Sequence, residues 1–398
     1  MFEIHGKYGF ASVYADMIDE ETVGQIQEIV NQKMAENSSI RIMPDCHYGK
    51  GAVVGLTMKI SEKVVPSFVG VDIGCGMLVV ELGNILIDLP SLDSFIRNYI
   101  PYESKVHKTV QEAFSITNLK CYPQLTKKNE LERSLGTLGG GNHFIEIDRD
   151  KKGILYLIIH SGSRSLGKEV GELYQKKAIA YQIAKEMHQE DMYLSALKKK
   201  GKKAYEMEEL LYRKGGPSSI SKAYCYLEGD LLKEYLHDMD ICQEFAKKNR
   251  IWMAKAIISF LGLSWQKLTT FECVHNYISI KDMILRKGAI SAYEGEKVLI
   301  PINMRDGCIL GMGKSNEAYN YSAPHGAGRL LSRKESRLRI TLEEYQKTME
   351  GIYSSSISDK TLDESPMAYK PLETILENIQ ETVSVIDILQ PIYNFKAS

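Results

Sequence analysis

One histidine lies in a run of small residues near the carboxyl-terminal end of the sequence, in segment 322–329, which reads Ser-Ala-Pro-His-Gly-Ala-Gly-Arg. Glycine and alanine on both sides of a reactive side chain let a ligand approach the backbone closely. A neutral imidazole attacks phosphorus readily and leaves readily once a second nucleophile arrives. His325 is therefore the candidate nucleophile of this chain.

Three histidines, one cysteine and one aspartate upstream have the side chains of metal ligands. They are Asp72, Cys75, His143, His160 and His275. In segment 70–76 (Gly-Val-Asp-Ile-Gly-Cys-Gly) the glycines permit a sharp turn, so that the carboxylate and the thiol can converge on one ion. A plain glycine-rich turn with a buried free cysteine is the alternative, and an isolated histidine such as His275 is more often structural. Together with His325, the set predicts an enzyme that transfers a nucleotide.

Segment 138–147 leads three glycines into an apparent strand. Strand alternation puts His143 on one face and Asn142, Phe144 and Glu146 on the other. We expect His143 to face a metal while Asn142 and Glu146 hydrogen-bond a ligand, with a phosphate close to the glycine backbone. A histidine whose bonds are satisfied within the core is the alternative.

The apolar run 154–159 predicts a buried strand that ends in His160-Ser-Gly-Ser-Arg164. Arg164 could hold a phosphate oxygen with its planar guanidinium, and a serine beside it could cap a helix at the same place. Upstream, Asp45 and His47 lie in a segment rich in turn residues. A carboxylate there could orient an imidazole that comes from elsewhere in the chain.

The composition fits a globular enzyme without a membrane anchor. With 398 residues, 44% of them hydrophobic, the chain can bury a core in one large domain or two. A net charge of -1 argues against a protein that coats nucleic acid, but it leaves room for a local basic groove. The seven cysteines form no C-x-x-C pair, which favours reduced thiols. No secretory leader and no apolar run of about 18 residues is evident, so we expect a cytoplasmic protein.

Short β-rich runs alternate irregularly with amphipathic stretches, which predicts a mixed α+β architecture. An acidic first turn at 19–21 begins a predicted surface helix, and 41–83 predicts strands joined by turns. Two long helical patterns, 166–200 and 230–261, flank the breaker Gly-Gly-Pro-Ser-Ser at 215–219, so the region of approximately 166–261 is a predicted helical insert. The basic run 198–203 could bind an RNA backbone, although a solvated helix end is the favoured interpretation. A helix near 372–383 and a strand over 385–395 complete the chain.

The motifs resemble those of the RtcB family of RNA-splicing ligases nearly from end to end. The matching segments are 43–47, 70–77, 135–146, 160–164, 275–277, 325–329 and 366–370. The resemblance implies a single catalytic domain over 1–398, with a mixed-sheet α+β fold of the RtcB type. It also implies a ligase, dependent on GTP and manganese, that joins an RNA 3′-phosphate or 2′,3′-cyclic phosphate to a 5′-hydroxyl. The RNA would be a tRNA or a damaged RNA, and an accessory activating protein is a further partner that the family allows.

The resemblance implies a site for two Mn²⁺ ions. Asp72, Cys75 and His143 would hold one ion, and Cys75, His160 and His275 the other, with the thiolate bridging both. Thiolate and imidazole alone would favour zinc, so the identity of the metal rests on the resemblance.

The resemblance also implies that His325 attacks the α-phosphate of GTP and carries GMP, with Asp45 orienting its ring and Arg164 beside the phosphates. A carboxylate facing the N1–H and N2 amine of guanine would explain a preference for GTP over ATP. The residues expected around the nucleotide are Asn142, Phe144, Glu146, Gly326, Ala327, Gly328, Tyr369 and Lys396.

The stretch before the nucleophile departs from the family pattern. Segment 301–307 reads Pro-Ile-Asn-Met-Arg-Asp-Gly where relatives tend to have a Gly-Ser turn, and Pro324 precedes the histidine. We expect Asn303 to hydrogen-bond the nucleotide still, and Arg305 either to contact a phosphate or to pair with Asp306. Two other functions stay open: a guanylyltransferase that caps a nucleic-acid 3′-phosphate without sealing it, and a non-catalytic RNA-binding component of a repair or ribosome-rescue system.

Overall fold

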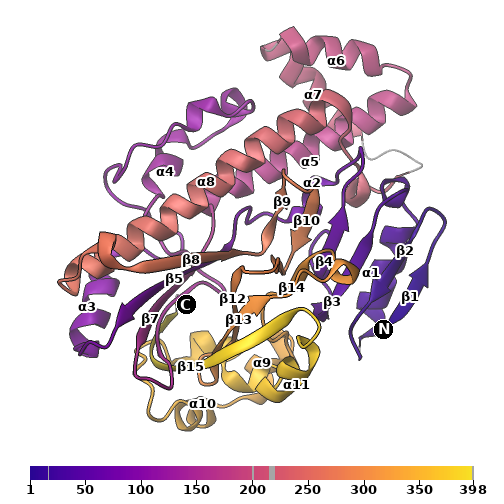
Figure 1. The fold of residues 1–398 in the computed structure, drawn as a ribbon. Coiled ribbons are helices and arrows are strands. Elements are labelled where there is room, and N and C mark those ends of the chain that lie inside the picture. The colour runs from indigo at the N-terminus through magenta and orange to yellow at the C-terminus, as the bar shows by residue number, and fades with distance from the viewer. Residues whose placement is uncertain (17, 200, 215–219, 397–398) are drawn as a thin grey trace.

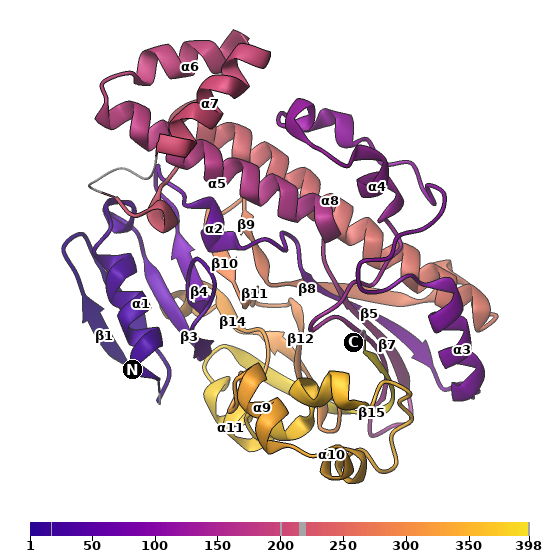
Figure 2. The same ribbon diagram turned by 180° about the vertical axis from the view of Figure 1, so that it is seen from behind.

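Two large β-sheets and one small sheet carry helices on their faces (Figures 1 and 2). The computed structural model describes residues 1–16, 18–199, 201–214 and 220–396. Helices and mixed sheets together confirm the predicted α+β class. The predicted breaker 215–219 lies outside the described residues.

The first large sheet has six strands in the order β1-β2-β3-β4-β10-β9, and one pair, β2 with β3, is parallel. Its strands are β1 (Phe2–His5), β2 (Phe10–Val13), β3 (Ile40–His47), β4 (Val54–Lys59), β9 (Asn276–Ser279) and β10 (Ile284–Lys287). Helix α1 (Glu20–Val30) begins where predicted, because the Asp19 carboxylate accepts a hydrogen bond from the Thr22 amide at 2.8 Å. It ends at Val30.

Asp45 and His47 lie within strand β3, so the turn expected around them is wrong. The pairing of β3 with β4 is interrupted between Ile42 and His47, where the register shifts. A shift of this kind bends the strand and re-aims its side chains without ending it. The turn residues of the sequence thus mark an irregular strand.

The second large sheet has seven strands in the order β12-β13-β15-β6-β7-β5-β8. They are β5 (Gly76–Gly83), β6 (Phe144–Arg149), β7 (Leu155–Ser161), β8 (Thr269–Val274), β12 (Lys297–Asn303), β13 (Gly307–Gly313) and β15 (Val383–Lys396). Every residue of β7 is buried, as the apolar run predicted. Alternate side chains of β5 pack into different cores, with Leu78 and Val80 on one face and Met77 and Val79 on the other.

Four helices form the region predicted as a helical insert: α5 (Arg164–Glu186), α6 (Glu190–Lys199), α7 (Lys202–Lys214) and α8 (Gly229–Phe260). The first predicted helix is interrupted, because His188 has a positive φ of 53° between α5 and α6. Figures 1 and 2 show α6 and α7 at the outer end, whereas α5 and α8 run across the body of the molecule. The basic run lies at the α6–α7 junction, where Lys202 is 90% exposed, which suits a solvated helix end.

Shorter elements complete the fold. The helices are α2 (Pro66–Val69), α3 (Leu89–Tyr99), α4 (Lys128–Arg133), α9 (Arg333–Arg339), α10 (Leu342–Thr348) and α11 (Leu372–Asn378), and the small sheet pairs β11 (Ala289–Ser291) with β14 (Ser322–Pro324). Among the described residues, none of the helices combines the length and the apolar character that a membrane crossing requires.

Two adjacent residues of α8 join the ends of several loops. Asn249 is fully buried, and its side-chain oxygen accepts hydrogen bonds from the amides of Gly136 and Thr137 at 2.8 and 2.9 Å. Its amide nitrogen donates to the Thr137 and Gly162 carbonyls at 3.0 and 3.1 Å. Arg250 donates to the carbonyls of Gly74 and Ser161, each at 2.8 Å. Helix α8 therefore ties together three chain segments that are far apart in sequence.

We predict that Asn249→Ala lowers the free energy of unfolding by about 3 kcal/mol, because several buried backbone groups lose their partner at once. Chemical denaturation monitored by circular dichroism measures the change. Asn98→Ala is the matched control, since Asn98 is exposed on α3 and bonds mainly within its own helix; a change within about 0.5 kcal/mol is expected there. Equal stabilities for the two variants would contradict the structural role of Asn249.

Candidate active site

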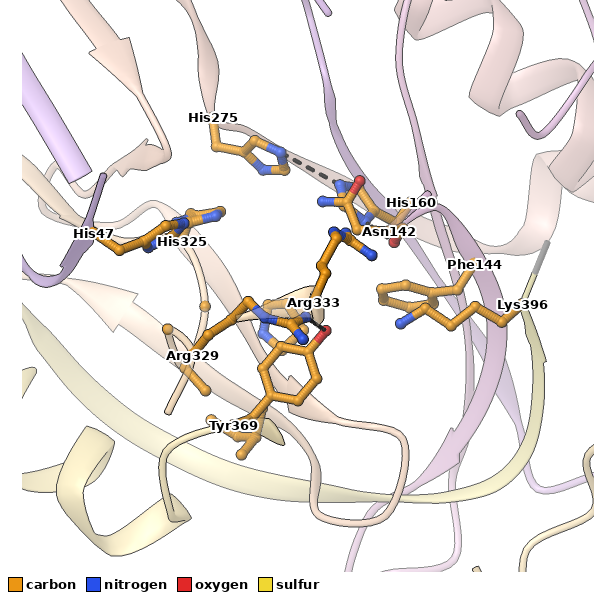
Figure 3. A pocket seen from close by; sticks show the side chains of 15 residues that line it. His47, Asn142, Phe144, His160, His275, His325, Arg329, Arg333, Tyr369 and Lys396 are labelled. Atoms are coloured by element: carbon orange, nitrogen blue, oxygen red, sulfur yellow. Dashed lines mark hydrogen bonds between the residues drawn. The ribbon is translucent and has the colours of Figure 1, made fainter. Parts of the chain in front are cut away.

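A pocket opens where strands β6, β7 and β12 face segment 325–329 (Figure 3). His160 and His275 lie on one side of it, and Phe144 and Lys396 lie next to each other on another side. The remaining lining residues are His47, Asn142, Pro301, Ile302, His325, Gly326, Ala327, Gly328, Arg329, Arg333 and Tyr369. Most of the residues predicted to surround a nucleotide thus share one cavity.

The predicted metal ligands form two overlapping sets around one sulfur atom. Cys75, His160 and His275 make one set, and Asp72, Cys75 and His143 make the other, with the ligand atoms of each set within 4.8 Å of one another. The Sγ of Cys75 lies 3.5 Å from Nε2 of His143 and 3.3 Å from Nε2 of His160. Both sets therefore need the same thiol.

In His143 and His160, a backbone carbonyl contacts Nδ1 and leaves Nε2 available to bind a metal. Nδ1 of His143 lies 2.8 Å from the Leu138 carbonyl oxygen, and Nδ1 of His160 lies 3.0 Å from that of Asn142. A carbonyl can only accept, so each Nδ1 carries the proton and donates it. Each Nε2 is then left to bind a metal, which is the usual arrangement around a metal-binding histidine. That of His143 also lies 2.9 Å from Oδ2 of Asp72, so a cation between these two atoms would satisfy both.

Burial favours the neutral form of His160 and His275. It lowers the pKa of His160 and of His275 well below the ordinary value, and the neighbouring histidines lower both further. Burial raises the pKa of the Cys75 thiol well above its ordinary value, and the Asp72 carboxylate adds to the increase. For Asp72, burial favours a higher pKa, but the contact of its Oδ2 with His143 lowers it.

The donor set fits divalent metal ions. Among the described residues, one carboxylate oxygen of Asp72 and Nδ1 of His275 are buried without a hydrogen-bond partner, and Nε2 of His275 lies 3.3 Å from that of His160. Buried polar atoms without a partner are costly, and a cation among these ligands would offset part of that cost. Five residues, Asp72, Cys75, His143, His160 and His275, could therefore hold two ions.

His325 is held by Asp45 beside this cluster. Its Nδ1 lies 2.8 Å from Oδ2 of Asp45, and its backbone amide donates to the same oxygen at 3.2 Å. The Asp45 side chain is fully buried, whereas that of His325 is 20% exposed to the pocket. Because Nδ1 donates to the carboxylate, Nε2 has a free lone pair, as a nucleophile requires. The ring centre of His325 lies 5.0 Å from that of His275.

A second group of charges lines the pocket opposite the histidines. Lys396 pairs with Glu364 at 2.5 Å, and the Tyr369 hydroxyl donates to the same carboxylate at 2.8 Å. Arg329 donates to the Tyr369 hydroxyl at 3.2 Å and lies over its ring. The Nζ of Lys396 also lies 5.7 Å from the centre of the Phe144 ring. Aromatic surface and cations together suit a nucleotide.

Glu146 lies behind the wall of this pocket. It is 3% exposed, and it accepts hydrogen bonds from Asn394 and from the Cys308 thiol. Contact with a base would require movement of the side chains that cover it. The strand begins at Phe144, so His143 belongs to the preceding turn and its position does not follow from strand alternation.

Asp148, two residues along the same face of β6, is fully buried, and neither of its oxygens has a donor among the described residues. Burial raises the pKa of both Glu146 and Asp148, and the Glu146 carboxylate raises that of Asp148 further. A proton on this pair relieves the repulsion.

Three further predicted residues, Arg164, Asn303 and Arg305, bond to other groups of the protein. Arg164 donates to Thr137 Oγ1 at 2.9 Å and to the Glu103 carbonyl at 2.6 Å. Asn303 bonds within its own turn, through its oxygen to the Arg305 amide and through its nitrogen to Asp306. Of the two alternatives for Arg305, the structure has the pair with Asp306, at 2.7 Å.

The sequence motifs did not reveal four residues that support the site: Asn249, Arg250, Arg333 and Glu364. The first two look like ordinary polar positions of an amphipathic helix. The acidic pair 363–364 lies one residue before the matched motif 366–370, and that position was the available signal for Glu364.

A family model described as tRNA-splicing ligase RtcB matches residues 25–114 and 102–397. The chain belongs to the RtcB family. It is 28% identical to the RNA-splicing ligase RtcB of Escherichia coli K12, over 89% of this chain and 88% of that protein. It is 25% identical to the tRNA-splicing ligase RtcB of Aeropyrum pernix, over 92% of this chain and 90% of that protein. The family resemblance noted from the motifs is thus confirmed.

The buried acid pair of this RtcB family member gives a prediction about stability. Because the folded-state pKa of Asp148 is raised, its contribution to stability is full below the unfolded-state pKa of about 3.9 and is lost as the pH rises through the folded value. We predict that Asp148→Asn raises the thermal midpoint at pH 8 by about 2 °C or more. The difference from the natural chain should shrink as the pH falls toward 4. A variant that is less stable at pH 8 would show that the charged pair stabilises the fold.

Proposed function

We propose that this protein is an RNA ligase that joins an RNA 3′-phosphate or 2′,3′-cyclic phosphate end to a 5′-hydroxyl end, with GTP as the source of energy. The family membership and the names of its relatives support the ligase assignment. The observation that carries the proposal is the Asp45–His325 pair, which presents a free imidazole nitrogen in the pocket beside the cysteine–histidine cluster.

In the proposed first step, Nε2 of His325 attacks the α-phosphorus of GTP. An N–P bond forms, the bond from that phosphorus to the bridging oxygen breaks, and pyrophosphate leaves with the electron pair. The ring becomes cationic, and the buried Asp45 carboxylate stabilises it through Nδ1. Arg329 and Arg333 line the same pocket and would offset the negative charge of the phosphates.

A 2′,3′-cyclic phosphate end is first opened by water, which adds to the phosphorus as its bond to the 2′-oxygen breaks and leaves a 2′-hydroxyl and a 3′-phosphate. An oxygen of the RNA 3′-phosphate then attacks the GMP phosphorus, the N–P bond breaks, and His325 becomes neutral again. The 5′-hydroxyl of the second RNA end then attacks the activated 3′-phosphate and loses its proton, and GMP leaves. An imidazole suits both the uptake and the release of GMP, because the ring is stable in its neutral form before the first step and after the second.

We propose that Asp72, Cys75 and His143 hold one divalent ion and that Cys75, His160 and His275 hold a second, Mn²⁺ in both cases. Such ions would neutralise phosphate charge and orient the reacting oxygens. The supporting observation is that Nδ1 of His143 and of His160 contacts a backbone carbonyl, while Nε2 of His143 lies 2.9 Å from Oδ2 of Asp72 and that of His160 lies 3.3 Å from Sγ of Cys75.

A sealing assay tests the whole proposal. Purified protein is incubated with GTP, MnCl₂ and two RNA strands, one ending in a 2′,3′-cyclic phosphate and one beginning with a 5′-hydroxyl. A lengthened product that requires GTP supports the ligase. A 3′ end tagged with GMP but never joined would instead identify a capping enzyme, and unchanged RNA without protein labelling would favour a binding component.

We predict that His325→Ala abolishes covalent labelling of the protein by α-labelled GTP, because the attacking nitrogen is gone. Label should survive SDS and be lost in acid in the natural chain. The Asp45→Asn variant should be labelled at a rate at least roughly 100-fold lower than that of the natural chain, since an amide can neither fix the tautomer nor stabilise the cationic ring. His188→Ala is the control, because His188 lies between α5 and α6 and does not line the pocket. Undiminished labelling of His325→Ala would identify a different nucleophile.

We predict that Cys75→Ala loses both bound ions, because one sulfur belongs to both ligand sets. Metal content per chain after dialysis, measured by mass spectrometry, gives a readout that does not depend on activity. Cys225→Ala removes a buried thiol that lies outside both sets and should keep the metal content of the natural chain. Two ions retained by Cys75→Ala would rule out the shared sulfur.

A further inference from the structure

We infer that Glu364 is a positioning residue that determines the choice of guanine over adenine, by fixing Lys396 and Tyr369 in the wall of the pocket. The inference rests on the proposed function, in which this pocket binds GTP. Glu364 itself does not line the pocket. It acts through side chains that do.

The Glu364 carboxylate is a point of convergence for residues from separate parts of the chain. Lys396 at the end of β15 pairs with it at 2.5 Å, and Tyr369 donates its hydroxyl proton to it at 2.8 Å. Arg333, at the start of α9, donates to it at 2.5 Å, and Arg329 lies 3.8 Å away. All four partners line the pocket. One buried carboxylate therefore holds most of one pocket wall.

Burial and charge make this arrangement rigid. The side chain of Glu364 is 4% exposed and that of Lys396 is 7% exposed, so water screens their attraction only weakly. Burial alone would raise the pKa of Glu364, but the charges of Lys396 and Arg333 lower it to about 2. The carboxylate is thus ionised throughout the working pH range and stays paired.

The fixed ammonium group suits one purine better than the other. Lys396 has three N–H donors and no acceptor, and Glu364 takes one of them. Guanine presents a carbonyl oxygen, O6, where adenine presents an amino group. An ammonium group held in place can donate a hydrogen bond to O6 of guanine, whereas with adenine it would face the amino group, which is another donor. Phe144 and Tyr369 border Lys396 with aromatic surface on which a flat base can stack.

The neighbouring Asp363 provides a matched comparison. It is also buried, and its carboxylate pairs with Arg333 and Arg337, but not with Lys396 or Tyr369. Replacement of either acid by its amide removes one buried negative charge next to the same arginine. The two variants differ in whether Lys396 and Tyr369 lose their anchor.

The experiment measures kcat/KM for labelling of His325 with GTP and with ATP, in the manganese-loaded full-length protein, for the natural chain, Glu364→Gln and Asp363→Asn. Both nucleotides carry the same triphosphate, so general electrostatic effects and a loss of folded protein cancel in the ratio. We expect Glu364→Gln to lower the GTP-to-ATP ratio by roughly tenfold or more, and Asp363→Asn to change it by less than about twofold.

A double variant separates positioning from a direct role. If Glu364 acts through the lysine, Glu364→Gln should lower the ratio little further once Lys396→Met is present. An unchanged ratio in Glu364→Gln, or an equal loss in Asp363→Asn, would overturn the inference while leaving the ligase proposal intact. Absence of labelling in the natural chain would instead overturn the proposed function itself.

Discussion

The site depends on two backbone carbonyls, those of Leu138 and Asn142, that each accept a hydrogen bond from Nδ1 of a buried histidine. These bonds leave Nε2 of both histidines beside the Cys75 sulfur, and that of His143 beside the Asp72 carboxylate as well. With the opposite tautomers, N–H groups would face the thiol and no cation could bind. Both carbonyls belong to the glycine-rich segment that precedes β6, so the backbone course of that segment determines the chemistry of the cluster.

Helix α8 keeps that segment in place. Asn249 bonds the backbone of Gly136 and Thr137, while Arg250 holds the carbonyls of Gly74 and Ser161. These contacts reach the chain immediately before Cys75, shortly before His143 and directly after His160. The region that the sequence suggested as an added helical insert thus contains the support of the cluster, which explains why a fully buried asparagine and arginine occur in the middle of a long helix.

How far the sequence predicts this site depends on how local each signal is. The α+β class followed from element patterns, and the convergence of Asp72 with Cys75 followed from the glycines between them. The proximity of Glu364 to a matched motif drew attention to it at most, whereas its contact with Lys396 and those of Asn249 with Gly136 could not be found in this way, because they span 32 and 113 residues of chain. Strand alternation correctly grouped Phe144 with Glu146. His143 lies among the metal-ligand candidates as expected, but for another reason, because β6 begins one residue later and His143 belongs to the turn before it.

Strand β6 connects the cysteine–histidine cluster at its beginning with the buried acids further along it. The strand runs from Phe144, which directly follows His143 of the cluster and whose ring lies 5.3 Å from that of His160, to the buried acids Glu146 and Asp148. At a rise of about 3.3 Å per residue, Glu146 lies about 7 Å and Asp148 about 13 Å from Phe144 along the strand. That spacing keeps the acids away from the cysteine–histidine cluster, where further negative charge would compete for cations. Phe144 and Lys396 lie between the two, so a bound nucleotide would meet an aromatic face and a cation before it reached the acids.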